Sequence, residues 1–277
     1  MENKIARWLD DSSYHSSYSS PSANSLNRSN SNSNSNSNSN LLDRLVNSTP
    51  SRIAVGRSGT RYKTETYLKM RADHAVAKDA VYSEVSEDLP IKFNLLPLKT
   101  NCTDREDYLL FPGRGRRLHP DSINLLNQHQ HQHQHQSQHS NSPDVQIIVG
   151  DGLSAWAINE NLPQLLPCLE QNIQAAGFLL GAFGIFVRFA RVGVQDHIGT
   201  LLNAKSTLIL VGERPGLGTG DSLSIYIAYN PKLDQDNAEK NCISNVRSLG
   251  LSPEEASKET VRILRKAFQK GRGGVSL

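Results

Sequence analysis

The chain has 277 residues, of which 37% are hydrophobic and 21% charged, and its formal net charge at pH 7 is +3. This mild charge disfavours a protein that binds nucleic acids, because phosphate-backbone binding needs a dense basic surface and the basic residues here are interspersed with acidic ones. Three widely spaced cysteines, Cys102, Cys168 and Cys242, suit neither a disulfide framework nor a zinc site and favour a reducing compartment.

The chain begins with a short charged segment followed by a tract of serine and asparagine. Residues 1–11 carry five charged side chains and no apolar core, so they are not a secretory signal. Residues 12–40 cannot bury enough apolar surface to offset the entropy lost on ordering. We therefore expect residues 1–40 to form a disordered tail. Ile5 and Trp8 fall at helical spacing within it, which leaves open either a short docking peptide or a frayed terminus.

Residues 41–126 are predicted to form a smaller, mostly helical N-terminal region. Apolar residues recur at three- and four-residue steps from Tyr67 to Val81, which is typical of one face of a helix. His74 lies on that face, where a packed, hydrogen-bonded histidine is favoured over a catalytic one. Residues 111–117 are rich in arginine and glycine, which indicates a loop that contacts a protein or a phosphate.

Residues 127–142 form a second polar insert, in which histidine and glutamine alternate. In an extended segment this alternation would place the imidazoles on one side, where they could chelate a transition metal. The insert contains no residues that would hold the imidazoles in place, as a dedicated metal site requires. We therefore expect a disordered, solvated loop with incidental metal affinity. Its histidines are His129, His131, His133, His135 and His139.

From residue 143 to the end, apolar strands alternate with helical segments. Strands are expected at 145–149, 183–189, 206–211 and 223–229, and helices through Trp156, at 162–176, at 195–203 and from the capping sequence Ser252-Pro253-Glu254-Glu255. This alternation predicts an α/β domain with a doubly wound, mainly parallel sheet. Ligands of such sheets bind beyond the carboxyl ends of the strands, where residues 150–154 and 212–222 fall. The apolar run at 177–190 is too short to span a membrane and contains Arg188.

The glycine-rich loop at 212–222 is the strongest local signal. It lacks the Lys-Ser/Thr pair of a Walker loop and does not open a first strand–helix unit, so a nucleoside triphosphate is disfavoured. Its glycines would let the backbone approach a large flat ligand. An ordinary strand exit is the alternative, although the charges of Glu213, Arg214 and Asp221 favour a ligand site.

No nucleophile, paired-carboxylate or metal-ligand motif can be assembled elsewhere, which favours a subunit that holds a cofactor without a catalytic or metal-binding residue of its own.

Several segments, in this order along the chain, resemble the small subunit of ethanolamine ammonia-lyase. The most distinctive are GERPGLG at 212–218 and CISN at 242–245. The others are RIAVGRSG at 52–59, ADH at 72–74, KD at 78–79, GRRL at 115–118, DVQ at 144–146, DGLS at 151–154 and RV at 191–192. The resemblance covers the chain from Arg52 to about Leu264, and the two polar inserts lie outside it.

The resemblance implies a lyase that converts ethanolamine to acetaldehyde and ammonia by a radical mechanism. Adenosylcobalamin would lie between residues 143–277 of this chain and a large subunit, which would bind ethanolamine and contact residues 41–126. The complex would be a hetero-oligomer with several copies of each subunit, in the cytoplasm or inside a bacterial microcompartment. The cobalt would keep the dimethylbenzimidazole of the cofactor as its ligand. This agrees with the spacing around His197, which differs from the Asp-x-His-x-x-Gly motif of corrinoid proteins and indicates a helix-surface histidine.

The resemblance carries three cofactor-binding positions onto this sequence: Val192, Glu213 and Cys242. Val192 would pack apolar surface against the cofactor, Glu213 would accept a hydrogen bond from it, and Cys242 would make a close contact as a small polarisable group. Each has a simpler alternative, namely a core valine, a loop carboxylate and a buried thiol. The alternative for the whole chain is an α/β regulatory subunit that binds a nucleotide, or an adaptor.

Overall fold

The computed structural model describes residues 36–49, 51–136 and 142–277, which fall into two compact units divided after Arg57. In the first unit the described helix is α1 (Asn36–Asn47). It begins inside the Ser/Asn tract, for which we expected disorder up to residue 40. The docking peptide considered around Ile5 and Trp8 lies outside the described residues.

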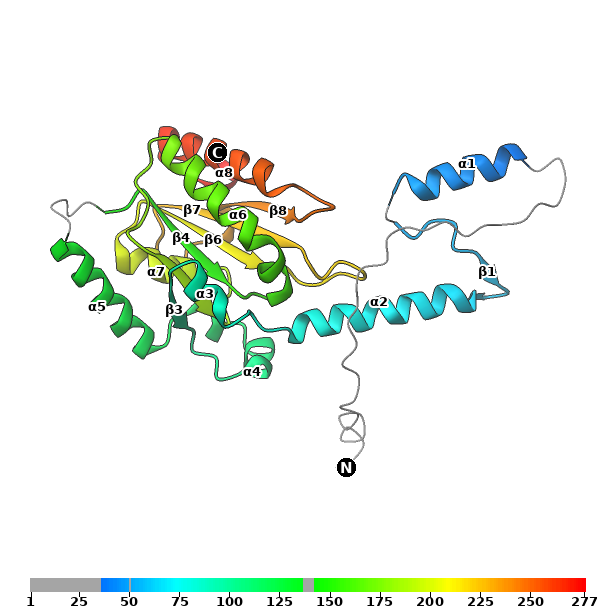
Figure 1. Cartoon of the computed structure of the whole chain (residues 1–277), viewed down its shortest axis with the longest axis horizontal. Helices are drawn as coiled ribbons and strands as arrows, with labels where there is room; N and C mark the ends of the chain where they lie inside the picture. Colours follow the sequence, from blue (N-terminus) through cyan, green and yellow to red (C-terminus); the bar gives the residue numbers. More distant parts are fainter. Residues whose placement is uncertain (1–35, 50, 137–141) are drawn as a thin grey trace, which may run out of the picture. The chain divides into compact units, whose positions relative to one another are not determined.

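The second unit is built on a six-stranded sheet with the strand order β3-β5-β4-β6-β7-β8 (Figure 1). The first four strands in this order are parallel, whereas β7 and β8 are antiparallel. The strands are β3 (Leu95–Lys99), β4 (Val145–Gly150), β5 (Gly184–Arg188), β6 (Ser206–Gly212), β7 (Leu223–Tyr229) and β8 (Lys240–Val246), with β1 (Arg57–Ser58) and β2 (Arg61–Tyr62) in a separate two-stranded sheet. The predicted α/β fold with a mainly parallel sheet is confirmed.

Helices cover both faces of this sheet (Figure 1). Helices α6 and α8 pack on one face and α5 and α7 on the other, and each pair encloses a hydrophobic core. Residues Ile147 and Val149 face the first core and Ile148 the second, because side chains alternate along a strand. The helices of this unit are α2 (Thr64–Tyr82), α3 (Asp88–Lys92), α4 (Arg105–Leu110), α5 (Pro120–Gln136), α6 (Ala155–Ala175), α7 (Val194–Leu202) and α8 (Pro253–Lys270), with short 3-10 turns at Arg114–Arg116, Asn237–Glu239 and Gly274–Ser276.

The two edge strands were not predicted. Strand β3 comes from the N-terminal region, which was expected to be mostly helical, and it pairs with β5 in the main sheet. Its central Pro97 lacks a backbone N–H and obscured the strand pattern, but an edge strand tolerates proline. Strand β8 has the polar sequence KNCISNV and forms the opposite edge. Helix α6, expected as two helical segments, is continuous across Pro163 and Pro167, which are both exposed.

Two histidine predictions differ from the structure. Helix α5 continues to residue 136, so much of the expected His/Gln loop is helical. His129 and His133, one turn apart on this helix, both pack with ring centroids 5.3 Å from that of Phe183. On α2, which forms where the apolar periodicity predicted it, His74 is exposed and not packed as expected.

Three further observations concern membranes, metals and cysteines. No helix among the described residues is both long and apolar enough to cross a bilayer. Within the same residues, no group of three or more histidine, cysteine or acidic side chains is placed to hold a metal ion. Cys102, Cys168 and Cys242 are all free thiols.

The loops that follow β4 and β6 contact each other backbone to backbone. Gly152 has a φ of +63°, and a Cβ atom there would lie 2.3 Å from the carbonyl oxygen of Gly212. Ser154 begins α6 by accepting a hydrogen bond from the backbone N–H of Ala157, and its hydroxyl donates to the carbonyl of Gly220 at 2.5 Å. The start of α6 is therefore tied to the glycine-rich loop after β6.

A comparison of two glycine substitutions tests this contact. Gly152 and Gly177 both have positive φ, but nothing lies within 4 Å of a Cβ built at Gly177. We expect Gly177→Ala to lower the free energy of unfolding by about 1 kcal/mol through backbone strain. Gly152→Ala should cost roughly 3 kcal/mol or more, because the backbones must also separate. Urea unfolding of the two variants would measure the difference, and equal losses would contradict the close approach.

Candidate functional site

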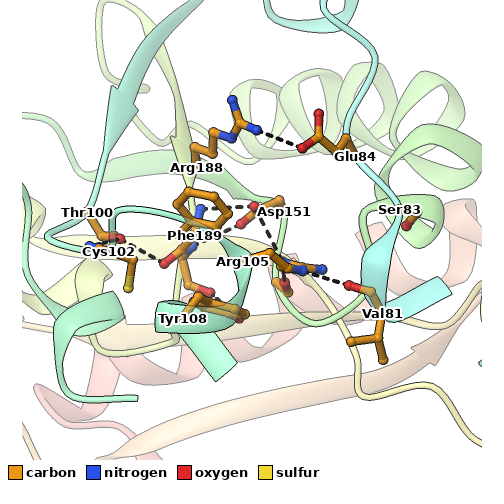
Figure 2. A network of polar contacts seen from close by, with 12 residues as sticks. Val81, Ser83, Glu84, Thr100, Cys102, Arg105, Tyr108, Asp151, Arg188 and Phe189 are labelled. Atoms are coloured by element: carbon orange, nitrogen blue, oxygen red, sulfur yellow. Dashed lines mark hydrogen bonds and ion pairs between the residues drawn. The ribbon is translucent and has the colours of Figure 1, made fainter. Parts of the chain in front are cut away.

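A buried carboxylate organises the carboxyl-terminal edge of the parallel strands (Figure 2). Asp151, directly after β4, accepts hydrogen bonds from the backbone N–H groups of Phe189 and Ala190, both at 2.9 Å. Burial raises the pKa of Asp151, and these two hydrogen bonds oppose the rise. Asp151 therefore joins the end of β4 to the residues that follow β5.

Two arginines pack around Tyr108 beside this carboxylate. Arg105 of α4 has Nη1 3.7 Å from Asp151 Oδ2, and its Nε donates to the carbonyl of Val81 at 2.6 Å (Figure 2). Arg191 donates from Nη2 to the carbonyl of Tyr108 at 2.9 Å, and its guanidinium carbon lies 4.1 Å from the centroid of the tyrosine ring. A guanidinium at this distance over an aromatic face is attracted to it, so the side chain of Arg191 is held in one orientation.

The turn after β5 carries the first predicted cofactor residue. Phe189 has a φ of +60°, an unfavourable value for a residue with a side chain. The turn is held by Asp151 and by two further hydrogen bonds to carbonyl groups, from the hydroxyl of Thr100 to Phe189 and from that of Tyr108 to Ala190, both at 3.0 Å. Val192 follows this turn, and Gly193 separates it from the start of α7 at Val194.

The carboxylate of Glu213, the residue after β6, packs beside β7 and β8. Its Oε1 accepts from the hydroxyl of Ser224 at 2.5 Å and from the backbone N–H of Asn245 at 2.9 Å, and its Oε2 accepts from Ser222 at 2.7 Å. Burial alone would raise the pKa of Glu213, but these hydrogen bonds and Arg247 hold it below its usual value. Its stabilising contribution is therefore present at neutral pH and is lost as the pH falls through the lowered pKa.

Cys242 belongs to the same cluster as Glu213. It lies opposite Tyr226 of β7 in the antiparallel register, and its thiol is hydrogen-bonded to Tyr226 and Ser224. Desolvation raises the pKa of Cys242, and it raises that of Tyr226 to about 12. Tyr226 packs against the core on the α7 side of the sheet, so Cys242 faces that side and remains exposed there.

Val192 lines a cleft of about 380 Å³ near the start of α7. A buried ion pair lies in this cleft: Lys240 Nζ is 2.9 Å from Asp196 Oδ2, and the two side chains are 1% and 2% exposed. Burial raises the pKa of Asp196 to about 6, against the lowering effect of Lys240, so the carboxylate is ionised at pH 7.5. Because Lys240 is two residues before Cys242 on β8, the cleft adjoins the Glu213 cluster.

The structure places the three predicted cofactor residues on one side of the sheet. Glu213 and Cys242 share a hydrogen-bonded cluster, and Val192 lies at the adjoining cleft. That they bind a cofactor stays a prediction. The buried pair of Asp196 and Lys240 was not found from the sequence, because nothing local marks two residues of different elements as partners.

Two glycines of the glycine-rich loop pack within the chain, since a Cβ at Gly212 would lie 1.9 Å from the carbonyl oxygen of Ser154 and one at Gly220 would lie 2.7 Å from the ring of Trp156. That the rest of this loop approaches a ligand stays a prediction. The prediction for His197 needs correction. His197 is not a simple surface histidine: its Nδ1 accepts a hydrogen bond from the backbone N–H of Leu118 at 3.1 Å. Burial lowers the pKa of His197, which favours the neutral ring.

Comparison with known proteins identifies similar chains. Residues 39–277 match the family described as ethanolamine ammonia-lyase light chain. The ethanolamine ammonia-lyase small subunit of Clostridium acetobutylicum is 42% identical over 236 residues, which cover 85% of this chain and 93% of that protein. The small subunits of Clostridium perfringens and of Listeria monocytogenes serotype 4a are 40% and 38% identical, over 83% and 84% of this chain and 74% and 76% of those proteins.

Mutation of the buried pair tests its contribution to stability. Lys240→Met leaves the carboxylate of Asp196 buried without its cation, and we expect a loss of about 3 kcal/mol in the free energy of unfolding. Adding Asp196→Asn should recover part of this loss, because the unpaired charge is removed. The exposed pair of Lys258 and Glu254 on α8 offers a control, since Lys258→Gln should cost less than about 1 kcal/mol. Strictly additive losses in the double variant would show that the pair does not interact.

Proposed function

The chain belongs to the ethanolamine ammonia-lyase light-chain family, and we propose that as the small subunit of this lyase it closes over adenosylcobalamin at the interface with a large subunit. The observation that supports this best is the position of Glu213, Cys242 and the Val192 cleft on one side of the sheet, where Cys242 is exposed. In this proposal residues 143–277 contact the cofactor.

The residues at this site fit a large cofactor that carries both apolar and amide groups. A carboxylate offers about four acceptor positions, and Glu213 uses three of them within the chain, so one remains for an external donor. Val192 supplies partly exposed apolar surface. The cleft beside it contains buried polar atoms without hydrogen-bond partners in the described residues, as a site for a polar ligand requires.

The role of this chain is to bind and orient the cofactor. Adenosylcobalamin, when bound, supplies the radical chemistry that converts ethanolamine to acetaldehyde and ammonia. Val192 packs against it, Glu213 accepts a hydrogen bond, and Cys242 makes a close contact. Because the pKa of Cys242 is raised, its thiol stays protonated at neutral pH and acts as a small soft contact, not as a nucleophile.

The large subunit is the partner that a small subunit requires. We place part of the contact on residues 41–126, where α2 exposes the large side chains of Tyr67, Leu68 and Val76. In this proposal the large subunit binds ethanolamine, and several copies of each subunit assemble in the cytoplasm or inside a bacterial microcompartment.

Co-expression with the large subunit tests the proposed activity. The full chain and the large subunit are co-purified, and acetaldehyde release from ethanolamine is measured with and without adenosylcobalamin. We expect turnover that depends on the cofactor and on both chains. A complex that loads cobalamin without turnover would overturn the proposed substrate and keep the cofactor, whereas turnover without adenosylcobalamin would overturn the cofactor.

Substitution of Glu213 tests its role in cofactor binding. Glu213→Gln keeps the side-chain volume but removes the charge and one accepting oxygen. We expect the affinity of the assembled complex for cyanocobalamin to fall roughly tenfold, as loss of one hydrogen bond to a charged group predicts. Equilibrium dialysis followed by absorbance measures it. Glu170→Gln on α6, an exposed site over the other core, makes the same chemical change and should leave the affinity unchanged. An unaltered affinity in Glu213→Gln would remove this residue from the site.

A further inference from the structure

Unpaired polar atoms are concentrated in the cleft beside Val192. Among the described residues, six buried side-chain nitrogen or oxygen atoms have no hydrogen-bond partner, and three of these belong to residues that line this cleft. They are Arg191 Nε, Asp196 Oδ1 and Gln235 Oε1. Leaving a buried polar atom without a partner is destabilising, so three at one cleft indicate a ligand that pairs with them.

The rest of each side chain is held by contacts within the protein. Asp196 uses Oδ2 for Lys240, which leaves Oδ1. Gln235 donates from Nε2 to the carbonyl of Tyr229 at 3.2 Å, and since a carbonyl only accepts, this contact assigns Oε1 as the unpaired end. Arg191 stacks on Tyr108 and donates to its carbonyl, so Nε is the atom without a partner.

These three atoms are two acceptors and one donor, a combination that selects the ligand chemically. A primary carboxamide has two N–H donors and one carbonyl acceptor, which matches the set. A carboxylate or phosphate has no N–H group to donate to Asp196 or Gln235, and an ammonium group has no acceptor for Arg191. The charges that line the cleft balance, which favours a neutral ligand: the cations are Arg116, Arg191 and Lys240, and the carboxylates are Asp196, Asp234 and Asp236.

We propose that this cleft is a carboxamide-binding subsite, in which Asp196 and Gln235 accept the amide N–H groups and Arg191 donates to the amide carbonyl. The inference rests on the proposed function, because the periphery of the corrin ring carries primary carboxamides. Val192 then borders an amide arm of the cofactor. The subsite adds Arg191, Asp196 and Gln235 to the cofactor-binding positions that the resemblance predicted.

Corrinoid derivatives test the subsite in the unmodified complex. The probes are cyanocobalamin and its monocarboxylic acids, in each of which one peripheral carboxamide is hydrolysed to a carboxylate. We expect at least one acid to bind tenfold more weakly or worse, because a carboxylate cannot donate to Asp196 or Gln235. Equal affinity for all the acids would overturn the subsite.

A matched pair of variants assigns that discrimination to the cleft. Gln235→Met removes the accepting amide, and we expect roughly tenfold weaker binding of cyanocobalamin and a smaller penalty for the discriminated acid. Gln174→Met makes the same change at an exposed position of α6 and should behave as the unmodified complex. Thermal unfolding confirms that each variant is folded.

The outcomes separate this inference from the proposed function. If the unmodified complex binds cyanocobalamin and Gln235→Met alters neither the affinity nor the penalty for any acid, the subsite is wrong and the cofactor proposal stands. If the unmodified complex binds no cyanocobalamin, both are overturned. If only Gln235→Met loses affinity and discrimination together, the subsite is supported.

Discussion

The arrangement of the candidate site depends on one buried carboxylate. Asp151 accepts two backbone N–H groups from the turn after β5, and this turn contains Phe189 in a left-handed conformation. The strain there is offset because the carboxylate, Thr100 and Tyr108 all hold the same short segment. Arg191 and Val192 follow within three residues, so the position of the cleft depends on a hydrogen-bond network at the sheet edge.

The two antiparallel strands carry part of the candidate site. Helix α7 packs on the core beside β4 and β6, whereas Cys242 on β8 remains exposed on that side. The loops at the ends of the parallel strands, where ligands of such sheets usually bind, instead pack tightly on each other through Gly152 and Gly212. The candidate site consequently extends from the ends of β5 and β6, which Val192 and Glu213 follow, onto β7 and β8.

Sequence reasoning succeeded where local pattern is strong and failed where structure depends on distant partners. The buried strands β4 to β7 are apolar runs, and the capping box at Ser252 marks the start of α8. Edge strands β3 and β8 escaped prediction because Pro97 and a polar composition hide their pattern. The resemblance to a family supplied Val192, Glu213 and Cys242, but only the folded structure shows that Asp196 lies next to Lys240 and that its second oxygen is unpaired.

The composition of the two edge strands affects how readily the small subunit aggregates before it binds its partner. An exposed sheet edge invites another chain to add a strand, which leads to aggregation. At one edge Pro97 offers no N–H group for such pairing, and at the other β8 is polar and pairs with β7 through an irregular register near Leu223. Both edges therefore discourage strand addition, so a newly synthesised copy can stay dispersed until it meets the large subunit.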